Sequence, residues 1–269
     1  MNIGIFDSGL GGLTILKSFI KNLPQYNYIY LGDNARVPYG NRSDDLIYEF
    51  TTEAIDFFVK KNCLLIIIAC NTSTAAALRK IQQEYLPKKY QNIKVLGVIR
   101  PTVEKVIENK YKKVGIIGTN ATINSQAFKK EILKLNPSIT IYQKGCPLLV
   151  PYIEDGNKNK KILKLLLKDY LKDIKNKIEA LVLGCTHYEI IKNEIKKVTG
   201  KNVKIISEGE IVAMSLKKYL NNHQEIERKL AKNKKIELYF TDFNRNYEKI
   251  MKIFFGKYWK NYQFSHVKI

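Results

Sequence analysis

The sequence predicts an α/β protein built on parallel sheets, and three observations support this prediction. Short runs of apolar, mostly β-branched residues recur along the chain. Each run ends at a small residue followed by a polar one, and stretches of helical character lie between the runs. Continuous apolar runs are typical of strands covered on both faces, as in a parallel sheet, and their alternation with helices indicates an α/β protein.

The first part of the chain alternates strand and helix regularly. Apolar runs that stop at a polar residue predict the strands, and the longer segments between them predict the helices that cover the sheet. The expected elements are a strand over 3–6, a helix over 13–23, a strand over 29–31, a helix over 44–61, a strand over 64–69 and a helix over 74–85.

The remaining part continues the pattern. Strands are expected over 95–99, 114–117 and 181–183, and the lysine-decorated segment 158–177 predicts an amphipathic helix. From Glu208 onward we expect a helix, a strand over 236–241, a helix near 247–255 and a last short strand.

Length and composition fit a globular cytoplasmic protein. The chain has 269 residues, of which 45% are hydrophobic and 26% charged, enough for one large or two modest domains. Its longest apolar run, 63–70, is far shorter than the roughly 20 residues of a membrane helix, and no signal peptide opens it. Four cysteines without an export signal point to reduced thiols, so we expect a cytoplasmic location.

The net charge of +21 raises the question of nucleic-acid binding. Of the 46 basic residues, however, 40 are Lys and only 6 are Arg, and the lysines are spread along the chain. Specific readout of bases and phosphates relies on the planar fork of Arg. Nucleic acid is therefore the minority expectation for a partner, and it stays open as a second activity.

A weak internal repeat predicts two similar halves. "LLIIIACNT" and "EALVLGCTH" are related units whose cysteines, Cys70 and Cys185, lie 115 positions apart, and "IGIFDSG" resembles "VGIIGTN". Two α/β halves that face each other would place these cysteines on opposite walls of one cleft. We expect a first domain over 1–97 plus 208–269 and a second over 98–207.

The functional side chains of a parallel sheet gather just beyond the carboxyl ends of its strands. Cys70 and Cys185 both stand there, whereas Cys63 opens a buried strand and Cys146 precedes a proline, so these two are better explained as buried packing residues. The other strand-end residues are Asp7, Ser8, Asp33, Thr119 and His187.

Two thiols across a cleft are compatible with several chemistries. A zinc site with Cys70, Cys185 and His187 is chemically feasible, although neither cysteine has a second ligand at the usual spacing. A disulfide does not suit a reducing compartment. In acid–base catalysis, one thiolate would remove a proton from a carbon while the other thiol donates one to the opposite face. A purely structural role for both is the remaining alternative.

Other strand-end residues favour a site for a small polar molecule. Gly9, Gly11 and Gly12 let the backbone approach a ligand and begin a helix with free N–H groups, although the loop matches neither a P-loop nor a dinucleotide fingerprint. His187 is placed to tune Cys185, while His223 is expected at the surface, as is His266. Neutral donors that could hold the carboxylates of an amino acid are Ser8, Asn71, Thr72, Thr119, Asn120, Thr122 and Thr186.

These motifs together carry a resemblance to a known family. The chain resembles the cofactor-independent glutamate racemases of the aspartate/glutamate racemase superfamily. The matching segments, in the family's order, are "IGIFDSGLGGLTIL" (3–16), "YLGDNARVPYGNRS" (30–43), "ACNTSTAAAL" (69–78), "VGIIGTNATINS" (114–125), "CPLLVPYIEDG" (146–156) and "LVLGCTHYEII" (181–191).

The resemblance implies two pseudo-symmetric α/β domains with the active site in the cleft between them, no cofactor and no metal. It implies that Cys70 and Cys185 are the two acid/base thiols, assisted by Asp7, Glu154 and His187. The substrate-binding positions that it implies are Asp7, Ser8, Tyr39, Gly40, Asn71, Thr72, Thr186 and His187, to which the residue pattern adds Thr119 and Thr122. The family makes D-glutamate for peptidoglycan synthesis in the cell wall, and its members commonly form homodimers.

The chain departs from the family pattern at three places. Glu189 stands where proline is usual, Arg100 stands where an acidic residue is frequent, and "ISEGEIVA" (206–213) replaces a more usual "IDSGEAVA". None of these changes removes an expected catalytic group. A racemase for aspartate or another acidic amino acid on the same scaffold is the nearest alternative function.

Overall fold

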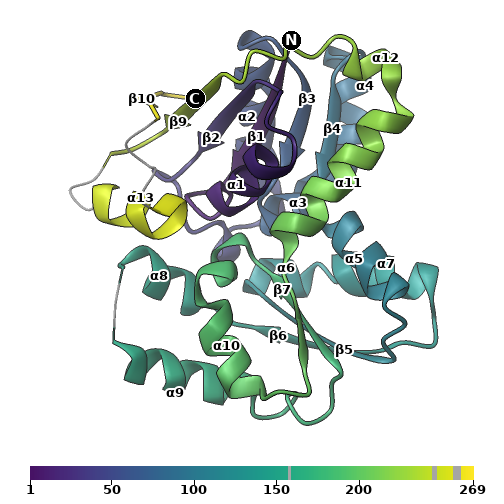
Figure 1. Ribbon diagram of the computed structural model, residues 1–269, viewed down its shortest axis with the longest axis vertical. Helices are drawn as coiled ribbons and strands as arrows, with labels where there is room; N and C mark the ends of the chain where they lie inside the picture. The colour runs from purple at the N-terminus through teal and green to yellow at the C-terminus, as the bar shows by residue number, and fades with distance from the viewer. Residues whose placement is uncertain (157–158, 244–246, 257–261) are drawn as a thin grey trace.

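The strands form two separate sheets, and every strand pair in both is parallel. A computed structural model of the chain describes residues 1–156, 159–243, 247–256 and 262–269 (Figure 1). The first sheet has the order β10-β9-β2-β1-β3-β4 and the second has the order β6-β5-β7-β8. The strands of the first sheet are β1 (Asn2–Asp7), β2 (Tyr28–Gly32), β3 (Cys63–Ile68), β4 (Lys94–Gly97), β9 (Ile236–Phe240) and β10 (Phe264–His266). Those of the second are β5 (Lys113–Gly118), β6 (Thr140–Gly145), β7 (Ala180–Gly184) and β8 (Lys204–Ile206).

The two sheets repeat one topology, which confirms the predicted pseudo-symmetry. The order β2-β1-β3-β4 in the first corresponds to β6-β5-β7-β8 in the second, so β1 matches β5 and β3 matches β7. In this topology the connections from β1 and from β3 run in opposite directions, and ligands bind at such a switch point beyond the strand ends. Each sheet therefore contributes one switch point.

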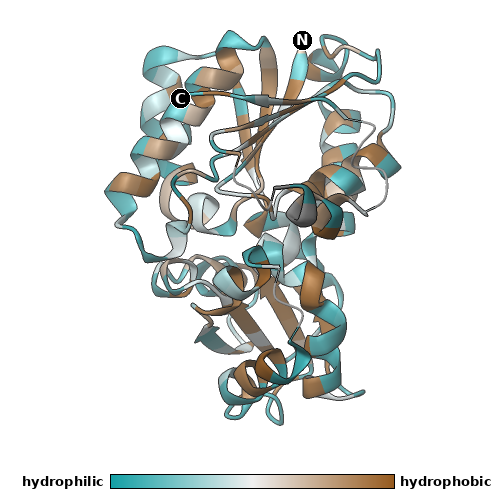
Figure 2. Ribbon diagram, turned by 90° about the vertical axis from the view of Figure 1, so that its left-hand side faces the viewer, coloured by the Kyte–Doolittle hydropathy of each residue, from teal (hydrophilic) through white to brown (hydrophobic). Residues whose placement is uncertain are grey.

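Helices cover the faces of both sheets, and the brown, apolar strands lie inside (Figure 2). The C-terminal α11 follows the second sheet yet packs on α1 and α5, as the long green helix in Figure 1 shows. The longer helices are α1 (Leu13–Asn22), α2 (Asp44–Lys60), α3 (Asn71–Lys80), α5 (Ile99–Glu108), α7 (Ala127–Leu135), α9 (Lys160–Leu171), α10 (Lys192–Thr199), α11 (Glu208–Asn222) and α13 (Tyr247–Phe255). The shorter ones are α4 (Leu86–Lys89), α6 (Asn120–Asn124), α8 (Leu149–Glu154) and α12 (Gln224–Glu227).

Local chemistry accounts for the helix boundaries. Ser43 caps α2 by accepting a hydrogen bond from the Leu46 N–H, and Asp44 and Asp45 follow in the first turn, where the helix dipole favours negative charge. Thr119 caps α6 in the same way. No helix among the described residues is long and apolar enough to cross a membrane.

The structure corrects several predicted boundaries. The strand expected over 95–99 ends at Gly97, and α5 begins at Ile99 with Pro101 in its first turn. A proline is tolerated in a first turn because the backbone N–H groups there have no partner inside the helix. The helix expected over 74–85 begins at Asn71 and passes into a π-helix over Ile81–Tyr85. The helix expected over 158–177 covers Lys160–Leu171, and residue 158 lies outside the described residues.

Two strands of the second sheet, β6 and β8, were not predicted. Both are edge strands, and β6 has no buried residue along its six positions, while β8 has only three residues. An edge strand needs no continuous apolar run, because one side of it is not covered by a neighbouring strand. The described strands of the first sheet all fall within 1–97 or 208–269, and those of the second within 98–207.

Candidate active site

The two strand-end thiols line one cavity between the sheets. Cys70 follows β3 and Cys185 follows β7, so they occupy equivalent positions in the two halves. The cavity has a volume of about 30 Å³, which is room for about two water molecules. Its lining residues are Ser8, Val37, Pro38, Tyr39, Gly40, Asn41, Cys70, Asn71, Thr72, Thr119, Pro147, Val150, Cys185, Thr186 and His187.

The Cys70 thiol lies at the N-terminus of α3, where its sulfur accepts a hydrogen bond of 3.5 Å from the Ser73 N–H. It also lies 3.4 Å from the Ser8 hydroxyl oxygen. Burial raises the pKa of Cys70, and the negative charge of Asp7 raises it further, while the bonds from Ser8 and Ser73 lower it. The surroundings therefore favour the neutral thiol of Cys70.

The Cys185 thiol belongs to a chain of three polar groups. Its sulfur lies 3.8 Å from Nδ1 of His187, and Nε2 of His187 lies 2.8 Å from Oε1 of Glu154. Burial by itself would lower the pKa of His187, but the contacts with Cys185 and Glu154 outweigh it and raise this pKa well above the ordinary value. The contacts with Cys185 and Glu154 therefore favour the protonated imidazole of His187.

Asp7 contacts both the glycine loop (Gly9, Gly11 and Gly12) and the residue that follows Cys185. It is fully buried, its Oδ2 accepts from the Gly9 N–H at 3.1 Å, and its Oδ1 accepts from the Thr186 hydroxyl at 3.2 Å. Burial raises the pKa of Asp7, and the positive charge of His187 opposes that rise. Asp7 is not among the described residues that line the cavity, and it contacts the lining residue Thr186 through this hydrogen bond.

The glycine loop is needed for close approach. A Cβ at Gly11 would lie 2.2 Å from the Thr186 hydroxyl oxygen and 2.5 Å from Nδ1 of His187. Real Cβ atoms do not come that close to other heavy atoms, so any side chain at Gly11 would displace the two residues that follow Cys185. Because Gly11 has no side chain, the loop that follows β1 in the first sheet packs directly on the loop that follows β7 in the second.

Hydroxyl groups from both halves meet at the opposite side of the cavity. Thr72 lies 2.9 Å from Thr119 and 3.2 Å from Thr122, measured between the hydroxyl oxygens, and Thr119 lies 3.0 Å from Thr122. Thr119 and Thr72 line the cavity, and Thr122 stands behind them. Asn120, expected among the donors, is exposed and does not line the cavity, because its side chain packs at Gly145 on β6.

Tyr39 is held in the cavity wall by a second buried carboxylate. Its hydroxyl donates to Asp33, which also accepts from Arg36 and, at 2.8 Å, from the Thr241 hydroxyl. This bonding fixes the loop that carries Pro38 and Gly40 into the wall. Asp33 thus stands at a strand end, as predicted, but serves the site indirectly.

The other two cysteines take no part in the cavity. Burial raises the pKa of Cys63 to about 12 and that of Cys146 to about 12. All four cysteines are free thiols. No three His, Cys, Asp or Glu side chains of the described segments come together as a metal-binding group, so the zinc alternative gains no support from the donor arrangement. Of the other histidines, His266 is exposed and His223 is half-buried.

Sequence reasoning missed Glu208, a buried carboxyl two residues beyond the end of the unpredicted strand β8. Its Oε2 accepts a hydrogen bond of 2.7 Å from the Asn71 side-chain amide. Had the short strand β8 been recognised, the rule of strand-end residues would have pointed to Glu208. The loop residues Val37 and Pro147 were also missed, and no signal in the residue types marks them.

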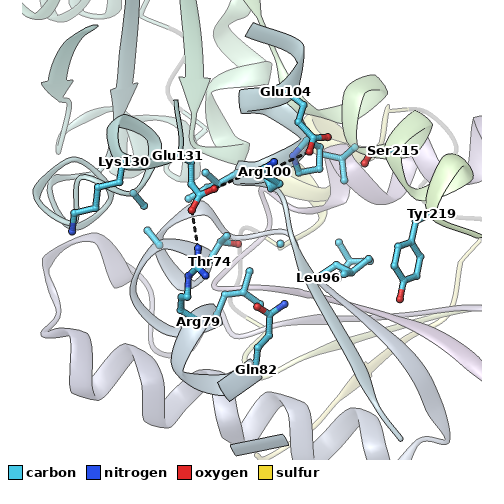
Figure 3. A pocket seen from close by; sticks show the side chains of 18 of the residues that line it. Thr74, Arg79, Gln82, Leu96, Arg100, Glu104, Lys130, Glu131, Ser215 and Tyr219 are labelled. Carbon is cyan, nitrogen blue, oxygen red and sulfur yellow. Dashed lines mark hydrogen bonds and ion pairs between the residues drawn. The ribbon is translucent and has the colours of Figure 1, made fainter. Parts of the chain in front are cut away.

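A larger groove of about 810 Å³ lies elsewhere between the two halves, lined by none of the predicted acid/base or substrate-binding residues (Figure 3). Ion pairs cross it: Glu131 of α7 accepts from Arg79 of α3 at 2.8 Å and from Arg100 of α5 at 2.9 Å. Arg100 also pairs with Glu104 at 2.8 Å on its own helix. The departure at Arg100 therefore belongs to this groove and not to the thiol cavity.

Two α/β halves that place paired thiols at equivalent strand ends define a two-sheet α/β protein with a thiol-lined cavity between its halves. The chain belongs to the Asp/Glu/Hydantoin racemase family, whose model matches residues 13–216, and it is an isomerase of that family. It is 39% identical over 258 residues to a glutamate racemase of Aquifex aeolicus, an alignment that covers 96% of this chain and 95% of that protein.

Solved structures agree with this assignment. The glutamate racemase isoform RacE1 of Bacillus anthracis has a TM-score of 0.88 and 32% identity, with 100% of this chain and 97% of that chain covered. The glutamate racemase of Francisella tularensis, solved in complex with D-glutamate, has a TM-score of 0.87 and 35% identity, with 99% and 97% covered. Both confirm the predicted fold class.

Proposed function

We propose that this protein interconverts L- and D-glutamate by a two-thiol acid–base reaction that uses neither cofactor nor metal. The observation that carries the proposal is the pair Cys70 and Cys185, at equivalent strand ends of two similar halves, on the wall of one cavity. Relatives and solved neighbours are glutamate racemases, which supports glutamate as the substrate.

The mechanism begins with the unequal surroundings of the two thiols. Cys185 lies 3.8 Å from Nδ1 of His187, whose contacts favour its protonated form, whereas burial and Asp7 favour a neutral thiol at Cys70. In this state Cys185 takes the α-proton of one enantiomer, and Cys70 gives a proton to the opposite face of the resulting carbanion. The reverse reaction exchanges the two roles, since Ser8 and the α3 N-terminus stabilise a thiolate at Cys70.

The α-proton of an amino acid is a weak acid, so the developing negative charge on the substrate needs stabilisation. Preorganised neutral donors provide it at no cost of rearrangement, and they are strongest in a closed, dry site. Ser8, Asn71, Thr72, Thr119 and Thr186 all line the cavity and offer such groups, together with Tyr39 and Gly40. We assign the substrate carboxylates to this set.

The cavity is much smaller than the roughly 300–1,000 Å³ of a typical ligand site. Substrate binding therefore requires its walls to move apart, and catalysis requires them to close again. The two walls belong to different sheets, so a change in the angle between the two predicted domains, 1–97 plus 208–269 and 98–207, is the simplest such movement.

Racemisation of glutamate by the purified protein, followed by circular dichroism, tests the proposal. Cys70→Ala and Cys185→Ala should each lower the rate by about 10²–10⁴-fold, while Cys63→Ala, at a buried thiol outside the cavity, should leave the rate at a fixed amount of folded protein unchanged. In deuterated water each enantiomer should gain deuterium at Cα as it converts. Activity on aspartate and none on glutamate would overturn the substrate assignment.

In the cell we propose that the protein is a cytoplasmic homodimer that supplies D-glutamate for peptidoglycan synthesis. Family membership supports this role. Depletion of the protein should cause loss of cell shape that added D-glutamate restores, and sedimentation should give twice the chain mass of 31.1 kDa. Growth without the protein and without D-glutamate would contradict the cell-wall role.

A further inference from the structure

Glu208 is a buried carboxyl that the two-thiol mechanism does not use. It is the first residue of α11, directly after the second sheet, and its exposed fraction is 4%. Its carboxyl contacts Asn71 of α3 and Thr102 of α5. Glu208 thus lies where the chain passes from the second half back to the first. It contacts the side chain of Asn71, which lines the thiol cavity.

The contacts of Glu208 suit a protonated carboxyl. Thr102 Oγ1 lies 2.9 Å from the Val98 carbonyl oxygen and 3.4 Å from Oε1 of Glu208. A hydroxyl has one proton, and the shorter contact with Val98 takes it. Oε1 therefore receives only a weak bond of 3.4 Å from Thr102 and can carry the carboxyl proton, while Oε2 accepts from the Asn71 amide at 2.7 Å.

Charges around Glu208 favour the same form. Burial raises the pKa of Glu208 to about 8, and the carboxylates of Glu189 and Asp7 contribute to the rise, against the hydrogen bonds from Asn71 and Thr102. Lys192, the first residue of α10, pairs with Glu189 at 3.2 Å and donates to Ser207 at 2.7 Å. Glu208 is therefore mostly neutral at pH 7.

The Asn71 amide is left half satisfied by this arrangement. Its Nδ2 group is held by Glu208, whereas its Oδ1 is buried and has no hydrogen-bond partner among the described residues. Asn71 lines the cavity beside Cys70. An unpaired buried acceptor costs free energy unless a donor arrives, and the ammonium group of an amino acid is such a donor.

We propose that Glu208 is a positioning residue of the racemase: its carboxyl holds the Asn71 side-chain amide with the carbonyl oxygen turned to the substrate ammonium group. The inference deepens the proposed function and rests on it for the identity of the substrate. Glu208 does not line the thiol cavity, so its loss should act on substrate binding through Asn71 and affect proton transfer less.

Two variants separate this role from a merely structural one. Glu208→Ala frees the amide to rotate and should raise the KM for glutamate about tenfold, with a smaller change in kcat. Glu208→Gln is neutral, has an oxygen for Asn71 and an N–H donor for Thr102, and should keep the KM of the native protein at pH 7. Glu210→Gln, an exposed residue on the same helix that pairs with Lys21, is the matched control and should change neither constant.

The pH profile supplies a readout that a structural role would not move. In the native protein the KM should change above pH 8, because the ionised Glu208 places a negative charge behind Asn71, and this change should be absent in Glu208→Gln. Asn71→Ala should raise the KM, and adding Glu208→Ala to it should have little further effect, because both act on one contact. An unchanged KM in Glu208→Ala, or equal pH profiles of the native protein and Glu208→Gln, would overturn the proposal.

A substrate-free measurement keeps this inference distinct from the proposed function. The NMR signals of the Asn71 side-chain amide protons should shift with pH about 8 as midpoint in the native protein. They should show no such transition in Glu208→Gln and should move to solvent-exposed values in Glu208→Ala. Absence of the transition in the native protein would refute the inference even if glutamate is racemised, and its presence would support the contact even if another amino acid is the substrate.

Discussion

Thr186 and Asp7 stand at strand ends of different sheets, and the Thr186 hydroxyl donates a 3.2 Å hydrogen bond to Oδ1 of Asp7. Both residues are buried, with exposed fractions of 5% and 0%. Thr186 follows Cys185 directly, and Asp7 contributes to the raised pKa of Cys70. One hydrogen bond thus connects the surroundings of the two thiols, so a substitution of Asp7 should affect both Cys70 and Cys185.

We predict that Asp7→Asn lowers the pKa of Cys70. Burial raises this pKa most, and the charge of Asp7, which the amide lacks, adds to it. The amide oxygen can still accept from Thr186 or Gly9, so the fold should persist, and kcat should fall by about 10²–10⁴-fold. Alkylation of Cys70 as a function of pH, resolved by peptide mass spectrometry, measures the shift.

Asp45→Asn, at an exposed position in the first turn of α2, is the control and should alter neither quantity. Full activity of Asp7→Asn would remove Asp7 from the proton-transfer machinery.

Glu154→Gln should lower the pKa of His187. The bond from Glu154 helps to keep this pKa raised against burial. Because the folded state binds the proton more tightly, its contribution to stability is complete below pH 6.5, the ordinary value, and is lost as pH rises through the folded pKa. The variant should therefore lose stability mainly at low pH.

NMR titration of the His187 ring gives the pKa directly. Urea unfolding at several pH values gives the stability. A pKa of His187 that is unchanged in Glu154→Gln would contradict the assigned contact.

Gly11→Ala should abolish most activity without unfolding the protein. The new Cβ would lie 2.2 Å from Thr186 and 2.5 Å from His187, so both side chains must move away from Cys185. A displacement of about 1 Å in a catalytic group costs about a hundredfold in rate. The rate of racemisation and the far-ultraviolet circular dichroism of the variant measure the two effects.

Gly200→Ala is the control, because it adds a methyl group at a glycine that lies in open space. Gly200 has a φ of +85° and no atom within 4 Å of its Cβ position, so alanine there should cost roughly 1–3 kcal/mol of stability and leave the rate unchanged. If Gly11→Ala behaved like Gly200→Ala, the close packing of the glycine loop would have no catalytic importance.

Glu131→Gln should weaken the connection between the two halves across the larger groove of Figure 3. Burial would raise the pKa of Glu131, but the bonds and charges of Arg100 and Arg79 lower it, so its contribution is present above pH 4.5, the ordinary value, and is lost as pH falls through the folded pKa. We expect a loss of about 1 kcal/mol at pH 7, because partly exposed pairs are screened.

Urea unfolding at low salt and at about 1 M salt tests this prediction, since screening at high salt should reduce the difference from the native protein. Glu104→Gln removes a pair within α5 alone and serves as the control. A difference that does not depend on salt would argue for a packing effect at Glu131.

Much of the site was predictable because parallel strands place their functional residues at one edge. Cys70, Ser8, Thr119 and Cys185 were identified from the polar residue that ends an apolar run, and all four line the cavity. Asp7 and Glu154 are one hydrogen bond further from it. The motifs that carry the family resemblance supplied Tyr39 and Gly40, which no strand-end pattern marks.

The sequence by itself determined the alternation of strands and helices, the two related halves and the separation of the four cysteines into two pairs. Only the tertiary structure decided which polar groups meet, because Asp7 with Thr186 and Asn71 with Glu208 are contacts between segments more than 130 residues apart. The protonation of Cys70, His187 and Glu208 was decided there too. Burial and the charges of neighbouring side chains set these pKa values, and neither is encoded in a local run of residues.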